Sequence, residues 1–474
     1  MLAGRCSLTD QVHSETKSSR RRLAWKLAGF VIGALVILGI ILALAPSDNL
    51  WLETKRKLEA RGEVLDWEKF IPPELPPDQN FFADPVAAIL LPIKGQPTTN
   101  NYLDIPELRH PTNSVDLGIP FSVARLAELP RESSADEKLS LTALHDWFAQ
   151  WDDALAQLRK ASERPHARLN GEYASPVESP ILNFVSVRNL AQVISSRAKV
   201  NLLLGDSAAA FEDLETLQVV MRSLQAQPGT LVSAMIHVAV SGLYLETIEE
   251  GLRRNIWSQE ELRKLIPQLT QSDLLISLKQ AIRSERAAVV RILTALTERK
   301  RDPLYKTSLD AFNSDEWRVR NVILRFSPPS RIRNDQAKYA LLIQDYLDAI
   351  VPSERRVDTA QVARANAHLS SLRGHWYFKY SVLAYVIPVI TKSFATATRC
   401  QGHADQLAIA CALELFHAHN KSYPSDLGQL VPAYIGSIPK NIDYQRTEDG
   451  YELLDPKTSP SQGSATLPFI WKKK

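Results

Sequence analysis

The longest uninterrupted apolar stretch lies near the start of the chain. Residues 27–45 read LAGFVIGALVILGIILALA, nineteen consecutive positions without a charge. At about 1.5 Å per residue, a helix of this length comes close to the roughly 30 Å hydrocarbon core of a membrane. Trp25 and Trp51 bracket it, as aromatic anchors at the two membrane surfaces would. The pattern predicts one transmembrane helix at residues 27–45.

Basic residues gather on the N-terminal side of this apolar run. Residues 1–26 carry six Lys or Arg and two acidic residues, a net charge of +4, and Arg20, Arg21, Arg22 and Lys26 directly precede the run. Cytoplasmic flanks of membrane helices are rich in Lys and Arg. We therefore expect residues 1–26 to be a basic cytoplasmic tail and the chain after the span to lie outside the cytoplasmic membrane of a bacterium, in the periplasm.

A cleaved signal peptide is the rival interpretation, because Ala43-Leu44-Ala45 has the small-x-small pattern of a cleavage site. Two features favour an uncleaved anchor. The apolar run exceeds the about 7 to 15 residues of a signal core. In addition, Pro46 occupies the position just after the cut.

Apolar residues recur at helical spacing through most of the remaining chain. Ser134-x-x-Glu137 is a capping box, and it opens a helix whose apolar residues lie three and four positions apart. These residues are Leu141, Leu144, Phe148, Trp151, Leu155 and Leu158. Further helices are predicted at 181–204, 207–225, 230–254, 273–300, 335–350 and 357–373, with Ser258-x-x-Glu261 capping a short one. The fold class is mainly α: an irregular helical bundle with a helical domain at 134–300, a polar loop at 301–334 and a helical continuation at 335–399.

A second apolar run, Leu231 to Leu245, is too short to span a membrane comfortably. It contains Ser233, His237 and Ser241, so we expect a helix buried inside the bundle, with His237 as a hydrogen-bonded core residue.

Residues 46–133 are predicted to be a stalk followed by a Pro-rich linker. Trp51 to Gly62 has helical composition and extends the membrane helix outward, whereas eleven prolines fall between Pro72 and Pro130. Proline removes a backbone donor, so regular helix and central strand are excluded there. This stretch is either an extended linker or a belt that lies across a domain.

The last 75 residues, 400–474, follow a different pattern. A helix running to Asn420 is broken by Tyr423-Pro424, and Ser425 can cap a brief helix around Leu427 and Leu430. Two short strand patterns, 442–447 and 451–454, then flank Asp449-Gly450, a strong hairpin signal. We expect a small α+β end made of a helix and a β-hairpin.

This ending resembles the head of type II secretion pseudopilins and type IV pilin-like proteins. The matching positions are Ala412-Leu413, Phe416, Asn420, Tyr423-Pro424, Leu427, Leu430 and Gly450-Tyr451. The resemblance covers about 50 residues and implies a helix packed on a small antiparallel sheet. It also implies secretion or pilus components as partners, with Tyr423, Pro424 and Tyr451 as candidate interaction residues.

Composition and motifs indicate no particular chemistry. The 448 residues after the tail carry 50 basic and 51 acidic side chains, which argues against nucleic acid as a partner. The common phosphate-loop, dinucleotide, zinc-protease and serine-hydrolase motifs are absent from the sequence. We assign no catalytic, cofactor-binding or metal-binding residue. His403, His417 and His419 are expected to face solvent near a helix end.

Cys400 and Cys411 are too far apart to form a disulfide if their helix is continuous, because three turns separate their Cα atoms by about 16 Å. A bridge would require the helix to begin after Cys400.

Together these patterns predict a single-pass membrane protein that acts as an interaction or scaffold component of the bacterial envelope, in association with a secretion or pilus-like system. The alternative is an anchored extracytoplasmic hydrolase whose site is assembled from residues distant in sequence. On motifs alone, an enzyme is the less favoured of the two.

Overall fold

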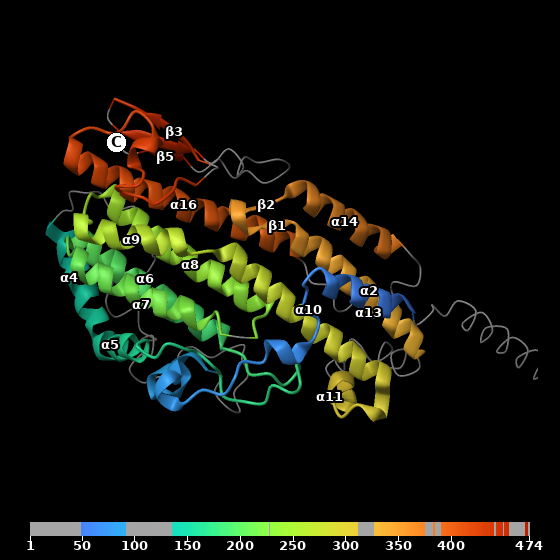
Figure 1. The fold of residues 1–474 in the computed structure, drawn as a ribbon. Helices are drawn as coiled ribbons and strands as arrows, with labels where there is room; N and C mark the ends of the chain where they lie inside the picture. Colours follow the sequence, from blue (N-terminus) through green and yellow to red (C-terminus); the bar gives the residue numbers. More distant parts are fainter. Residues whose placement is uncertain are drawn as a thin grey trace, which may run out of the picture.

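The computed structural model describes residues 49–91, 135–226, 228–310, 327–374, 383, 390–439, 442–448, 450–454 and 470–472. The predicted cytoplasmic tail and transmembrane helix lie outside the described residues, as do residues 92–134 of the Pro-rich stretch. The described part is mainly helical, as expected, and forms one elongated body (Figure 1).

The half of the body that carries the chain's C-terminal end is built from seven helices and the sheet. The helices are α4 (Ala135–Phe148), α5 (Asp152–Ala161), α6 (Phe184–Leu204), α7 (Ser207–Ser223), α8 (Leu231–Arg253), α9 (Gln259–Gln271) and α16 (Ile390–Asn420). The predicted seam from Leu141 to Leu158 is interrupted by the 3-10 turn η6 (Ala149–Trp151), so it belongs to two helices.

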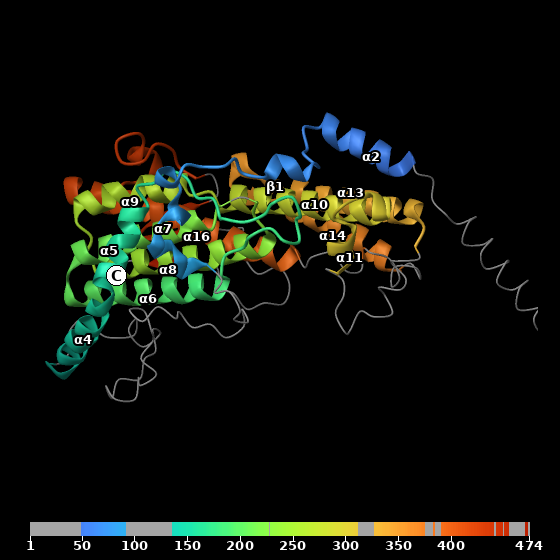
Figure 2. The ribbon, with the colours of Figure 1, turned by 90° about the horizontal axis from the view of Figure 1, so that it is seen from below.

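The other half is made of long helices that run along the body (Figure 2). They are α2 (Asn49–Ala60), α10 (Leu274–Glu298), α13 (Pro329–Asp348) and α14 (Thr359–Gly374). A short α11 (Tyr305–Asp310) follows the turn η7 (Arg299–Arg301), and β1 (Ile350–Val351) pairs with β2 (Arg356–Val357) around the turn η9 (Pro352–Glu354). The segment 301–334, expected to be a loop, therefore contains α11 and the first turns of α13.

Local sequence signals set most helix boundaries. Ser258 and Glu261 form the predicted capping box at the start of α9, and Thr230 with Ser233 forms another at the start of α8. Gly205 ends α6 with a φ of 85°, a left-handed conformation that glycine adopts without steric cost. These signals explain why the predicted helices at 181–204, 207–225, 230–254 and 273–300 are found within a few residues of their expected ends.

Helix α8 lies at the centre of the body. Among the described residues it is the one helix long and apolar enough to cross a membrane. It is packed against α6, α7, α10 and α16, and His237 and Tyr244 are buried within it. The apolar run at Leu231–Leu245 is accordingly a core helix, as its length and polar residues predict.

The segment that follows the predicted span packs tightly onto the body. Helix α2 lies along α13, where Leu58 and Leu65 form a small buried cluster with Ala340. Four short 3-10 turns follow: η1 (Trp67–Phe70), η2 (Pro77–Gln79), η3 (Phe81–Ala83) and η4 (Pro85–Leu90). Phe81, Phe82 and Leu90 are buried in the main core. Of the two alternatives left open for this stretch, the described part up to residue 91 is a belt.

The C-terminal end follows directly after α16. The helix is continuous for 31 residues and ends at Asn420, as predicted. The brief helix is the 3-10 turn η11 (Leu427–Leu430), which is capped by Asp426; the expectation of Ser425 as the cap is wrong. The predicted hairpin is β3 (Asp443–Arg446) with β4 (Tyr451–Leu454), and β5 (Ile470–Lys472) adds a third strand that was not predicted.

Cys400 and Cys411 both lie on the continuous helix α16 and are free thiols. Because the helix is continuous, the two thiols are too far apart to form a bridge, as predicted. Burial raises the pKa of the Cys400 thiol to about 12, so it is protonated at neutral pH.

Candidate functional site

The sequence-predicted residues Tyr423 and Tyr451 meet at the joint between α16 and the terminal sheet. Both hydroxyls donate to the same acceptor, Oε1 of Glu414, at 3.2 Å from Tyr423 and 3.1 Å from Tyr451. Glu414 lies on α16, Tyr423 in the loop after it and Tyr451 on β4. One carboxylate therefore ties three successive segments of the C-terminal end together. We call Glu414, Tyr423, Tyr444 and Tyr451 the tyrosine joint.

Aromatic contacts complete the tyrosine joint. The rings of Tyr423 and Tyr451 meet edge to face, with centroids 5.0 Å apart, and His417 stacks on Tyr423 at 4.5 Å. The hydroxyl of Tyr444 donates to the carbonyl of Pro424 at 2.8 Å, which fixes the loop against β3. Tyr451 and Pro424 are buried, whereas Tyr423 is partly exposed. Of the three predicted interaction residues, Tyr423 is the one that offers surface to a partner.

The environment raises the pKa values of two tyrosines of the joint, Tyr423 and Tyr444. Burial and the neighbouring Glu414 carboxylate raise the pKa of Tyr423 well above its ordinary value of 10.0. Burial also raises the pKa of Tyr444. The hydroxyls of Tyr423 and Tyr444 thus remain donors throughout the physiological pH range, and the joint acts as a structural hydrogen-bond centre.

A cavity of about 430 Å³ lies beside the tyrosine joint. The connection between α8 and α9 supplies Asn255 and Trp257, and α16 supplies Glu414 and His417. Trp257 packs so closely on Gly251 that a Cβ there would lie 2.2 Å from its indole nitrogen. The cavity places one carboxylate, one imidazole and two amides, Asn255 and Gln259, around a partly apolar floor, a combination that suits a polar or aromatic side chain of a partner.

The histidines do not converge into a metal site. His403 is mostly buried, and its Nε2 lies 3.0 Å from Oε2 of Glu249 on α8. The expectation that it faces solvent is wrong, because α8 covers that side of α16. His417 is half-buried against Tyr423, whereas His419 is exposed as expected. Among the described residues, no group of three or more His, Cys, Asp or Glu side chains is placed to hold a metal ion.

Two buried groups in the helical core have shifted pKa values without forming a site. Burial lowers the pKa of His237 to about 4, so the imidazole is neutral at pH 7. Burial raises the pKa of Asp213 on α7 to about 7, against the opposing charge of Arg197. Asp213 accepts a hydrogen bond from Asn201 at 3.1 Å.

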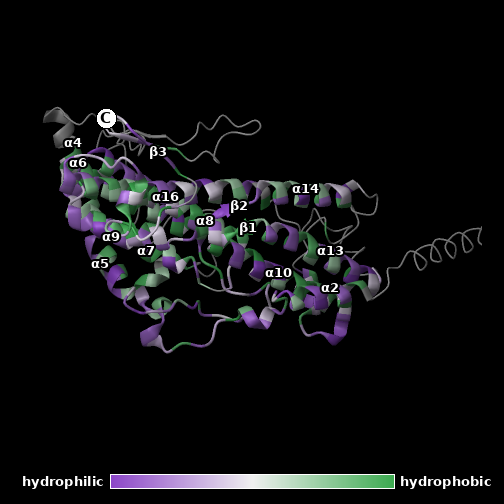
Figure 3. Ribbon diagram, turned by 45° about the horizontal axis from the view of Figure 1, so that its top comes forward, coloured by the Kyte–Doolittle hydropathy of each residue, from purple (hydrophilic) through white to green (hydrophobic). Residues whose placement is uncertain are grey.

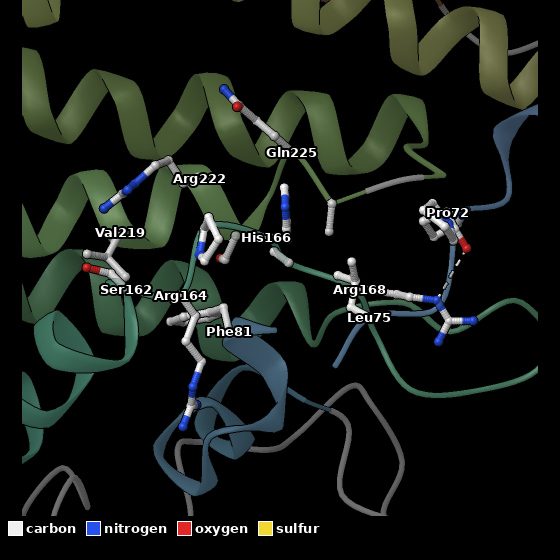
Figure 4. A pocket seen from close by; sticks show the side chains of 15 residues that line it. Pro72, Leu75, Phe81, Ser162, Arg164, His166, Arg168, Val219, Arg222 and Gln225 are labelled. Atoms are coloured by element: carbon white, nitrogen blue, oxygen red, sulfur yellow. Dashed lines mark hydrogen bonds between the residues drawn. The ribbon is translucent and has the colours of Figure 1, made fainter. Parts of the chain in front are cut away.

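A second cavity of about 430 Å³ lies between the belt and helices α5 and α7. Three arginines line it, but their guanidinium groups point in different directions (Figure 4). Arg164 pairs with Asp84 at 2.8 Å, and Arg168 donates to the carbonyl of Pro72 at 3.3 Å. Arg222 points away from both (Figure 4). The basic residues therefore do not form a cradle for an anion.

The chain matches no protein-family model, no curated protein sequence and no solved structure.

The sequence pointed to Tyr423 and Tyr451 but not to their shared acceptor. Glu414 was overlooked because a glutamate on a helix is ordinarily a solvated residue. Its position nine residues before Tyr423 gives no local signal, and only the fold of the hairpin brings Tyr451 to it.

Proposed function

We propose that this chain is a membrane-anchored interaction protein of the bacterial envelope, which presents its α+β end to a partner at a fixed position outside the membrane. The observation that carries the proposal is the continuity of α16. Its first part packs among α8 and α10, its middle and later parts on α9, and its last turns hold the terminal sheet. A partner bound at this end is therefore coupled rigidly to the whole body.

The proposed partner is a component of a secretion or pilus-like system, because the end resembles the head of pilin-like proteins. Residues 404–413 of α16 are buried in the body, so this stretch of the helix is not available for assembly with copies of itself. A docking role fits this geometry better than a role as a filament subunit. The exposed residues of η11 and the edge strand β3 are the proposed contact surface.

Site-specific photo-cross-linking in the intact cell tests this proposal. A photoreactive amino acid is introduced at Gln429 on η11 or Gln445 on β3, both exposed, and at exposed Ala367 on α14 as a matched control. We expect the same secretion or pilus component to be captured from the first two positions and not from the third. Equal capture from all three positions, or no reproducible product, would contradict the proposal.

The second candidate, an anchored hydrolase, is favoured by one observation. Glu414 and His417, one turn apart on α16, line the same cavity. A carboxylate and an imidazole can serve as a general acid–base pair. Glu414 already accepts two tyrosine hydroxyls, however, which suits it to a positioning role. Hydrolysis of generic ester or peptide substrates that is lost in His417→Ala, with the fold intact, would favour this candidate.

A further inference from the structure

A buried ionic cluster fixes the orientation of the segment that follows the predicted span. Glu63 accepts hydrogen bonds from Arg283 at 2.8 and 3.1 Å and from Arg286 at 2.6 Å. Arg286 is fully buried and also donates to Gln344 of α13. We call Glu63, Arg283, Arg286 and Gln344 the Glu63 clamp. It joins the start of the belt, just after the C-terminal end of α2, to α10 and α13.

The clamp fixes the C-terminal end of α2, and a second ion pair helps to fix the direction of the helix. Arg61, just after α2, binds Asp348 at the end of α13 with contacts of 2.8 and 2.9 Å. Helix α2 therefore runs in the same direction as α13, and the start of α2 lies toward the end of the body where α13 begins and α10 finishes (Figures 1 and 2). Asn49 comes four residues after the last residue of the predicted span. If the span crosses the membrane, this end of the body is the end nearest to it.

The same end carries a run of consecutive basic residues. Arg299, Lys300 and Arg301 form the turn η7 after α10, and Lys306 follows on α11; all four are exposed. Arg299 donates to the carbonyl of Ser327 at 2.9 Å, which holds the turn beside the start of α13. Along the ribbon, α2 and the adjoining part of α10 are made largely of hydrophilic residues (Figure 3).

Nearby acidic groups do not cancel this charge. Asp302 is buried and is neutralised by Arg291, with contacts of 2.7 and 3.0 Å. Glu298 and Asp310 are exposed and flank the four bases, so the stretch from 298 to 310 keeps an excess of positive charge at its surface. Anionic lipid headgroups attract such clusters within about one Debye length of the membrane.

We propose that the basic end formed by Arg299, Lys300, Arg301 and Lys306 docks on the anionic phospholipid headgroups beside the anchor and holds the body upright on the membrane. This inference rests on the membrane anchoring in the proposed function and adds a second contact with the bilayer. The partner is identified by charge complementarity and by where the chain enters α2.

The docked orientation sets the height of the C-terminal end. Helix α10 starts at Leu274, whose backbone N–H donates to Gln401 of α16, and its 25 residues span about 37 Å. Helix α16 runs antiparallel to α10. Its nineteen residues beyond Gln401 therefore extend further away from the basic end, by about 28 Å. The tyrosine joint then lies several tens of ångströms from the lipid surface.

The test uses the full chain reconstituted in lipid nanodiscs that carry a paramagnetic nickel-chelating headgroup. A spin label is placed at exposed Pro303, beside the basic turn, or at exposed Gln429 on η11, with Cys6 and Cys400 replaced by Ser. In bilayers with phosphatidylglycerol we expect strong relaxation enhancement at position 303 and little at position 429. Pure phosphatidylcholine or high salt reduces the enhancement at 303.

Charge reversal supplies the specific variant and its matched control. Lys300→Glu, Arg301→Glu and Lys306→Glu together are expected to lower the docked-to-undocked ratio at position 303 on the order of tenfold or more. The control variant carries Lys160→Glu, Arg222→Glu and Arg446→Glu, which change the net charge by the same amount at exposed positions elsewhere. It should leave the docked-to-undocked ratio at position 303 unaltered.

The outcomes separate this inference from the anchoring itself. A chain that resists carbonate extraction but shows equal enhancement at positions 303 and 429 overturns the docking alone. The same holds if the enhancement at 303 is indifferent to phosphatidylglycerol. A chain that does not insert into the bilayer overturns both the docking and the anchoring.

Discussion

Two attachments hold the ends of the described chain on its helical body, and they use different chemistry around one glutamate each. In the Glu63 clamp, a buried carboxylate is bound by two arginines. In the tyrosine joint, Glu414 accepts hydrogen bonds from two hydroxyls whose rings pack edge to face. The clamp depends on charge compensation and the joint on packing with hydrogen bonds. Each should therefore fail under different perturbations.

The largest effect is expected from removing the buried arginine of the clamp. Arg286→Met leaves the Glu63 carboxylate without its fully buried partner and should cost about 3 to 5 kcal/mol of unfolding free energy. Denaturant unfolding, together with hydrogen exchange of residues 49–91, measures the loss and its location. Arg61→Met, which breaks the exposed pair with Asp348, is the control and should cost less than about 1 kcal/mol. Equal losses in the two variants would contradict the role of burial.

Acid should weaken the clamp. Burial opposes the ionisation of Glu63, but the hydrogen bonds from Arg283 and Arg286 outweigh it and lower its pKa from 4.5 to about 2. The resulting stability is fully present above pH 4.5 and is lost as the pH falls toward 2, by up to about 3 kcal/mol. The difference in unfolding free energy between the native protein and Glu63→Gln, measured from pH 5 to 2, should shrink accordingly. Glu59→Gln, at an exposed position, should show no such trend.

Two glycines on α8, one of them at the wall of the cavity beside the joint, test the packing. Replacing each by alanine should change the stability in opposite directions. Gly251→Ala places a methyl group against the indole of Trp257 and should destabilise the protein by about 1 to 3 kcal/mol. Gly242→Ala, also on α8, meets no atom within 4 Å and should stabilise it by about 0.5 to 1 kcal/mol. Thermal unfolding midpoints of the two variants check both signs. A loss in both would show that the contact with Trp257 is not the cause.

The smallest effects are expected at the hydroxyls of the joint. Tyr451→Phe and Tyr423→Phe each remove one donor to Glu414 and should cost about 1 kcal/mol, because the other donor remains. The double variant leaves the carboxylate without either hydroxyl and should cost more than the sum of the two. A double-mutant cycle by chemical denaturation measures this coupling. Simple additivity would show that the two hydroxyls do not act on a shared acceptor.

Features specified by neighbouring residues could be predicted from the sequence. The capping box at Ser258 and Glu261, the left-handed Gly205 and the hairpin at Gly450 each depend on a few adjacent positions. The predictions failed where two local signals competed. Asp426 caps η11 in place of Ser425, and α11 begins two residues after Pro303 in a stretch that was predicted to be a polar loop.

Contacts between distant residues could not be predicted in the same way. Nothing near Glu63 distinguishes it from a solvated glutamate, because its partners Arg283, Arg286 and Gln344 lie on other helices. Hydrophobic spacing shows which face of a helix is buried but not which helix covers it. For this reason α2 was predicted to be a free stalk, and His403 was expected in solvent although α8 covers it.

The Glu63 clamp also constrains the order of events during synthesis. Glu63 is separated from Arg286 by 223 residues and from Gln344 by 281. The segment around Glu63 therefore emerges long before the helices that bind it. Contacts of such large sequence separation form late and slowly in folding. Until α13 has been translated, the belt has no surface to close on, so the N-terminal part of the body is the last to become protected although it is the first to be made.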